Sequence, residues 1–191
     1  MKIALIQGHP DPHAGRFCHA LADAYATAAH EGGNEVQIID VAHMQFSMLR
    51  SALDWQEGVP PAEILAAQET LAWAEHVVIV FPLWLGGMPA LLKGFFEHAL
   101  RPGFAIGQAA PGRMWKKLLK GRSARLIVTM GMPAFFYRLY YRSHSVKSLK
   151  RNILEFCGIS PVRTTLVGTV DSAAARALAL AKVQMLGRSG R

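Results

Sequence analysis

Short apolar runs alternate with stretches of helical periodicity along the chain. The apolar runs are Ile3–Gln7, Val36–Asp40, His76–Phe81, Arg125–Met130 and Val162–Val170. The helical stretches are Phe17–Ala29, Pro61–Ala74, Leu91–Leu100, Ser145–Cys157 and Ser172–Leu186. Strands that alternate with helices pair in parallel through right-handed crossovers, with helices on both faces of the sheet. The pattern predicts one α/β domain over residues 1–191, a doubly wound three-layer sandwich whose common strand order is 2-1-3-4-5.

Two connections are longer than this plan requires. The segment Val41–Pro60 is long for a loop, and we expect a short helix near Met44–Leu49 within it. The segment Arg101–Arg122 is a second long excursion between the third helix and the fourth strand.

Composition narrows the class of protein. The net charge is +8, which indicates either a solvated basic surface or attraction to phosphate-bearing molecules, nucleic acid or acidic membranes. Two cysteines are too few for a disulfide framework, and His9 and His13 lack a third metal ligand nearby, so we expect no metal site. Prolines and glycines interrupt the longest apolar stretch and no export signal is present, so we expect a cytoplasmic protein.

The loops after the first and third strands contain the least ordinary sequences. Ligands of such sheets bind beyond the carboxyl ends of the strands, where the strand order reverses, which here lies between these two strands. The first loop, Gly8–Phe17, leads into a helix N-terminus that favours a phosphate, with His9, His13 and Arg16 as added donors. An ordinary strand-to-helix turn is the alternative interpretation.

The second loop, Pro82–Pro89, combines glycines with an apolar wall of Leu83, Trp84 and Leu85. Glycines let the backbone approach a flat ligand, and we expect the N–H groups of this loop to be unused by the sheet. A heteroaromatic ring with nitrogens and carbonyls along its edge needs such a lining. In the alternative interpretation, Trp84 only caps the core.

The second loop and its surroundings resemble a known family. FPLWLGGMPALLKGFFEHAL (81–100) looks like the signature segment of the flavodoxin-like NAD(P)H:quinone oxidoreductases. The GHP that follows the first strand, TMGM (129–132) and EFCGI (155–159) support the resemblance. It implies a flavodoxin-like three-layer sandwich and a flavin-dependent enzyme that transfers a hydride from NAD(P)H, by way of flavin N5, to a quinone in ping-pong fashion.

The resemblance also implies site residues. FMN is the expected cofactor, because the chain is shorter at its C-terminus than the FAD-using mammalian enzymes and leaves less protein to hold an adenine. FAD is the alternative. Tyr137 is the expected catalytic residue, with His144 as its partner. The expected cofactor-binding residues are His9, Arg16, Phe17, Cys18, Pro82, Leu83, Trp84, Leu85, Gly86, Thr129, Met130, Gly131 and Met132. The chain departs from the family where TMGM replaces Thr-Thr-Gly-Gly and where Arg16-Phe17-Cys18 replaces Ser-Phe-Asn.

Relatives in that family are homodimers, so a homodimer is expected. The aromatic run Phe135–Tyr141 is expected to line a quinone pocket or a subunit contact rather than to stack on nucleic-acid bases. The alternative function is a flavin-binding regulatory subunit on a membrane transporter, with peripheral membrane association. A flavodoxin electron carrier fits less well, because such carriers tend to be acidic and this chain is basic.

Overall fold

The computed structural model describes residues 1–107 and 115–191, and the long excursion Arg101–Arg122 therefore lies partly outside the described residues. Five parallel strands form one sheet in the order β2-β1-β3-β6-β7, which confirms the predicted topology. The strands are β1 (Lys2–Gln7), β2 (Glu35–Asp40), β3 (His76–Pro82), β6 (Ser123–Thr129) and β7 (Val162–Val167). The two-residue strands β4 (Ile106–Gly107) and β5 (Lys116–Lys117) pair antiparallel within the excursion.

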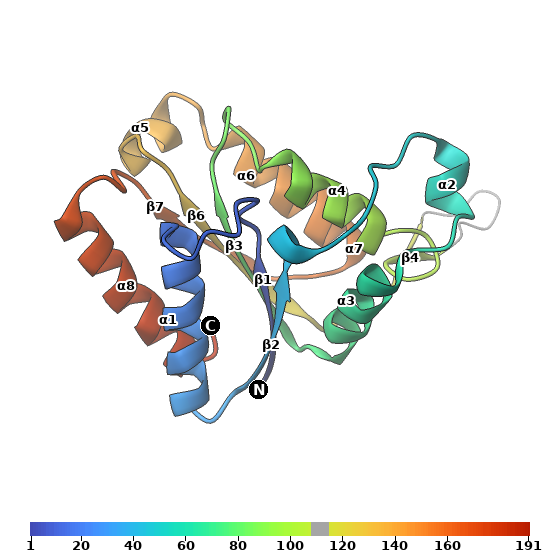
Figure 1. The fold of residues 1–191 in the computed structure, drawn as a ribbon, viewed down its shortest axis with the longest axis horizontal. Helices are drawn as coiled ribbons and strands as arrows, with labels where there is room; N and C mark the ends of the chain where they lie inside the picture. Colours follow the sequence, from blue (N-terminus) through green and yellow to red (C-terminus); the bar gives the residue numbers. More distant parts are fainter. Residues whose placement is uncertain (108–114) are drawn as a thin grey trace.

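Helices cover both faces of this sheet (Figure 1). On one face lie α1 (Phe17–Glu31) and α8 (Ala173–Arg188). On the other lie α3 (Ala62–Trp73), α4 (Ala90–Ala99) and a helical run of α6 (His144–Ser148), a π-helical segment (Leu149–Leu154) and α7 (Glu155–Cys157). That run confirms the predicted helix, and it ends at Gly158, whose φ of 107° suits only glycine.

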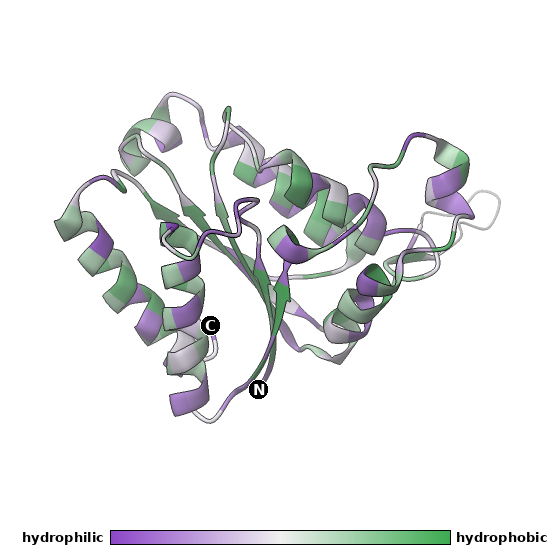
Figure 2. Cartoon of the chain, in the orientation of Figure 1, coloured by the Kyte–Doolittle hydropathy of each residue, from purple (hydrophilic) through white to green (hydrophobic). Residues whose placement is uncertain are grey.

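The alternation of side chains along the strands divides the core into two halves. Ile3 and Leu5 of β1 point to α1 and α8, whereas Ala4 and Ile6 point to α3 and α4. The central strand β3 is buried along its whole length, as a parallel strand between two helical layers must be. Figure 2 shows the sheet as the most continuously hydrophobic part of the chain.

Two local predictions were wrong. Residues 44–50 form no helix; a 3₁₀ turn (Val41–His43) precedes them and the short helix α2 (Ala52–Gln56) follows. The 3₁₀ turn and α2 form where Asp40 and Ser51 accept hydrogen bonds from the first backbone N–H groups. Helix α5 (Ala134–Leu139) was not predicted, and β7 ends at Val167 instead of Val170.

No helix in the described ranges, 1–107 and 115–191, has the length and hydropathy required to cross a bilayer.

Helices α1 and α8 pack closely where Gly187 faces the backbone of α1. A Cβ at Gly187 would lie 2.4 Å from the Tyr25 carbonyl oxygen. We predict that Gly187→Ala destabilises the protein by about 1–3 kcal/mol through overpacking, although alanine is ordinarily the better helix former. Urea unfolding measures the change, and exposed Ala181→Gly reports the propensity contribution in the same helix. A more stable Gly187→Ala variant would contradict the close contact.

Candidate functional site

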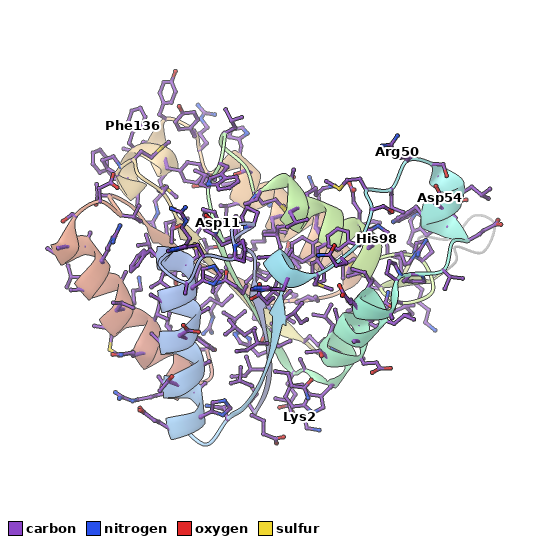
Figure 3. The ribbon with its side chains drawn as sticks, viewed as in Figure 1. Lys2, Asp11, Arg50, Asp54, His98 and Phe136 are labelled. Carbon is purple, nitrogen blue, oxygen red and sulfur yellow. The ribbon has the colours of Figure 1, made fainter. Side chains whose placement is uncertain are left out.

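Backbone hydrogen bonds bring the turns after β1, β3 and β6 to one edge of the sheet. The Gly8 N–H donates to the Val80 carbonyl and the Leu83 N–H to the Thr129 carbonyl, each at 2.8 Å. The Met130 N–H donates to the Val167 carbonyl at 2.9 Å. Figure 3 shows Asp11, in the turn after β1, near this edge, while Lys2 marks the opposite end of the strands.

Side chains of the first turn hold its own backbone. The Asp11 N–H donates to His9 Nδ1 at 3.1 Å, and the His13 N–H to Asp11 Oδ1 at 2.9 Å. The Gly15 N–H donates to His13 Nδ1 at 3.1 Å. The His13 N–H and the Arg16 guanidinium, which lies 2.6 Å from Asp11 Oδ2, lower the pKa of Asp11. Arg16 is thus a partner of Asp11, and its charge is already partly balanced.

The start of α1 offers backbone N–H donors that do not depend on the Arg16 side chain. No side chain caps the helix, and the structure in its described ranges records no acceptor for the N–H groups of Phe17 and Cys18. Free N–H groups and the helix dipole favour an anion at this point. Burial raises the pKa of the Cys18 thiol to about 12, so Cys18 is a neutral group here. Its Sγ lies 3.2 Å from Thr129 Oγ1 and joins α1 to the last residue of β6.

The second turn is a two-residue hairpin. Trp84 and Gly87 exchange both backbone hydrogen bonds, at 2.9 and 2.8 Å, and the central residues Leu85 and Gly86 have φ of 45° and 76°. Positive φ at both positions is typical of a type I′ turn. The expectation that the sheet uses none of the N–H groups of this loop was wrong for Leu83, whose N–H donates to Thr129 of β6, whereas those of Trp84 and Gly87 pair within the turn. The N–H groups of Leu85 and Gly86 have no acceptor among the described residues.

Leu85 is the strained residue of this turn. A leucine at positive φ costs about 1–2 kcal/mol relative to glycine, and its side chain projects fully into solvent instead of packing. Such strain is concentrated at functional positions. For Gly86, the structure adds a second reason to the predicted approach of a ligand: its φ is positive, and a Cβ there would meet no protein atom within 4 Å.

His9 and Trp84 connect the first two turns. Their rings meet edge to face, with centroids 5.7 Å apart. His9 is buried, and its pKa is lowered by that burial and then by the neighbouring His19. Because Nδ1 accepts the Asp11 N–H, a neutral His9 carries its proton on Nε2. Trp84 is half exposed, so it does not simply cap the core.

Tyr137 and His144 both line a hollow of about 270 Å³ at this edge. Gly86 of the hairpin, Tyr140, Tyr141 and Ser145 complete its lining. The hydrogen-bond partner of the Tyr137 hydroxyl in the structure is Ser145 Oγ, at 2.7 Å, and the catalytic partnership with His144 stays a prediction. Tyr137 is almost fully buried, whereas His144 is exposed. Ser145 was not predicted, since it reaches the tyrosine only through the arrangement of α5 and α6.

The remaining predicted residues divide between rim and core. Met130 belongs to the core on the α3 and α4 face, and Pro82 is buried at the end of β3. Phe17 is partly buried, with the Arg176 guanidinium 5.3 Å from its ring centroid. Gly131 is exposed and Met132 half-buried in the turn after β6. Of these five residues, Gly131 alone leaves open backbone for a ligand.

Comparisons with known proteins agree with this geometry. Residues 1–186 match the family model described as "Flavodoxin-like fold". The chain is 27% identical over 174 residues to an uncharacterized NAD(P)H oxidoreductase of Haemophilus influenzae, which covers 89% of this chain and 85% of that protein. It is 32% identical over 98 residues to FMN-dependent NADH:quinone oxidoreductase 1 of Bradyrhizobium diazoefficiens, covering 51% and 47%.

A solved structure is similar over nearly the whole chain. It is that of a putative quinone reductase from Klebsiella pneumoniae, at a TM-score of 0.83 and 25% identity. The similarity covers 97% of this chain and 83% of the Klebsiella chain.

The hairpin makes a testable distinction between its two glycines. We predict that Gly86→Ala destabilises the protein by about 1 kcal/mol because alanine resists positive φ. Gly87→Ala should change stability less, since a Cβ there meets only the Trp84 carbonyl at 3.9 Å and φ is not positive. Thermal unfolding of the two variants measures the difference. Equal stability would show that the turn does not hold the described conformation.

Proposed function

The chain belongs to the flavodoxin-like fold family, and we propose that it is a flavin-dependent oxidoreductase that transfers a hydride from NAD(P)H to a quinone. The observation that carries the proposal is the convergence of three turns at one sheet edge, each offering a different contact. The names of the Klebsiella and Bradyrhizobium proteins support quinone as the acceptor class, and the latter supports FMN.

The residues at this edge fit a flavin mononucleotide. The free N–H groups of Phe17 and Cys18 would hold the phosphate, because a helix N-terminus stabilises a dianion there. The N–H groups of Leu85 and Gly86, with the open backbone at Gly131, would face the ring. Bound flavin supplies the redox chemistry, since its ring accepts a hydride from a nicotinamide and returns it to a quinone.

Tyr137 is the residue that we place beside the reacting ring. When the Ser145 hydroxyl donates to the tyrosine oxygen, the Tyr137 O–H is free to donate into the hollow. A preorganised donor of this kind stabilises negative charge that develops near it. Ser145 then acts as a positioning residue, and His144 is a second donor at the mouth of the same hollow.

Aromatic side chains surround the mouth of the hollow. Phe136 and Tyr140 stack with centroids 5.2 Å apart and an angle of 6°, and Tyr141 packs edge to face against both. Flat apolar faces at an open mouth suit a quinone, which offers little to hydrogen-bond except its carbonyls. The net charge of +8 would attract the phosphates of NAD(P)H.

Reconstitution tests the proposal directly. We expect purified protein to bind FMN, to show its absorbance after dialysis, and to oxidise NADPH or NADH only when a soluble quinone is added. Parallel initial-rate lines would support ping-pong transfer. Protein that takes up neither FMN nor FAD would overturn the proposal. Protein that binds flavin without turnover would favour the regulatory alternative.

Tyr137→Phe separates the chemistry from flavin binding. We predict a reduction rate at least about tenfold slower, through loss of one donor, with flavin content near normal. Ser145→Ala should slow the same step less, since it frees the tyrosine without removing its hydroxyl. Stopped-flow mixing with NADPH measures both, and Tyr25→Phe, which removes a hydroxyl on the α1 and α8 face of the sheet, is the matched control. An unchanged rate in Tyr137→Phe would remove this residue from the mechanism.

A further inference from the structure

Two arginines lie side by side at the end of the sheet opposite the candidate site. Arg125 of β6 and Arg163 of β7 are partners in the parallel register, so their side chains leave the same face. That face is the one covered by α1 and α8. Arg125 is only 7% exposed, whereas Arg163 reaches solvent. Like charges opposite each other on neighbouring strands destabilise a sheet.

No carboxylate balances this pair within the described parts of the chain. The ion pairs recorded there do not include Arg125 or Arg163. Arg125 donates from one guanidinium nitrogen to Thr165 Oγ1 at 2.9 Å, and its buried Nε has no partner. Two nearby acidic side chains are engaged elsewhere: Glu31 accepts from Arg188, and Glu75 accepts from the Lys2 N–H.

Further buried polar groups beside the arginines lack partners. His76 Nδ1 lies 2.7 Å from Ser123 Oγ, but its buried Nε2 has no partner among the described residues, and neither does the buried Tyr25 hydroxyl. Burial and the positive charges of Arg125 and Arg163 lower the pKa of His76 to about 4, so the ring is neutral at pH 7. A buried donor without an acceptor lowers the free energy of unfolding, so a ligand that supplied acceptors here would stabilise the fold.

A hollow of about 320 Å³ adjoins this cluster. His76, Ser123 and Arg163 line it from the strands, and Gly190 and Arg191 line it from the end of α8. Its lining includes no aspartate or glutamate side chain. The volume is larger than a bare oxyanion requires, so it admits an oxyanion that carries a small organic group.

We propose that this hollow is a second ligand site, which binds a phosphoryl oxyanion, either inorganic phosphate or the end of a small phosphorylated metabolite. Arg163 and Arg191 are its direct ligands, and the buried charge of Arg125 strengthens the attraction from behind them. The anion removes the repulsion between the two strand arginines. The site is independent of the flavin edge, because the two lie at opposite ends of the same strands.

Thermal unfolding in phosphate against chloride, at matched ionic strength and pH 7, tests the site. The protein is saturated with FMN beforehand, so that the N-terminus of α1 is filled. Inorganic phosphate and ribose 5-phosphate are compared as probes; the tighter binder identifies free anion or phosphate ester as the ligand. We expect the melting temperature to rise and saturate with either probe. A response that disappears when FMN is present would place the anion at α1 and overturn the proposal.

The variant Arg163→Gln tests whether the stabilisation by phosphate comes from this hollow. The exposed Arg151→Gln is the control, because it removes one positive charge elsewhere. Arg163→Gln should raise the half-saturating phosphate concentration at least about tenfold, and it should not lower stability in chloride, because it removes the repulsion with Arg125. Arg151→Gln should respond like the unaltered protein. If phosphate stabilises the two variants equally, the proposal is refuted. The comparison can be made even if the protein binds no flavin. If Arg163→Gln does not fold, crystals of the unaltered protein are soaked in selenate. An anomalous selenium peak at Arg163 would support the proposal, and its absence would overturn it.

Discussion

The candidate site depends on backbone hydrogen bonds that continue the parallel ladder one residue beyond the strands. Gly8 pairs with Val80, Leu83 with Thr129, and Met130 with Val167. Because these bonds fix where each turn leaves the sheet, the turns begin at the same level and face one another. Packing favours glycine at Gly8, since a Cβ would lie 2.7 Å from a Leu92 methyl carbon, which would have to move, and 3.1 Å from the Val80 carbonyl oxygen.

Hydrogen bonds within each of these turns determine which of its N–H groups remain available to a ligand. His9 and Asp11 satisfy their own loop, which leaves the start of α1 uncapped and open to an anion. The hairpin after β3 forms its own hydrogen bonds through Trp84 and Gly87, which leaves Leu85 and Gly86 facing outward, with Leu85 under backbone strain. In both turns, internal hydrogen bonding selects which N–H groups stay available to a ligand. A site of this kind is preorganised, because its donors are fixed before a ligand arrives.

The sequence was sufficient for the fold and for the edge where the site lies, because strand periodicity and turn residues are local properties. It was not sufficient for contacts that depend on three-dimensional approach. Ser145 meets Tyr137 only because α5, which the periodicity did not predict, redirects the chain before α6. Arg16 stays a predicted phosphate ligand, but its ion pair with Asp11 depends on the path of the loop and could not be predicted. The short helix formed after Ser51 rather than at Met44 because a capping hydroxyl, not apolar spacing, determines so short an element.

The two ends of the sheet differ in how charge is managed. At the carboxyl ends, Arg16 is balanced by Asp11, and the attraction for an anion comes from helix N–H groups. At the amino ends, the positive charges of Arg125 and Arg163 lie opposite each other on neighbouring strands. Within the described residues, neither arginine forms an ion pair with a carboxylate. A buried guanidinium with an unpaired Nε lowers the stability of the fold, and a bound anion would offset this loss. The amino end of the sheet is therefore where binding of an anion would change the stability of the fold most, because there the ligand would neutralise a repulsion between neighbouring strands.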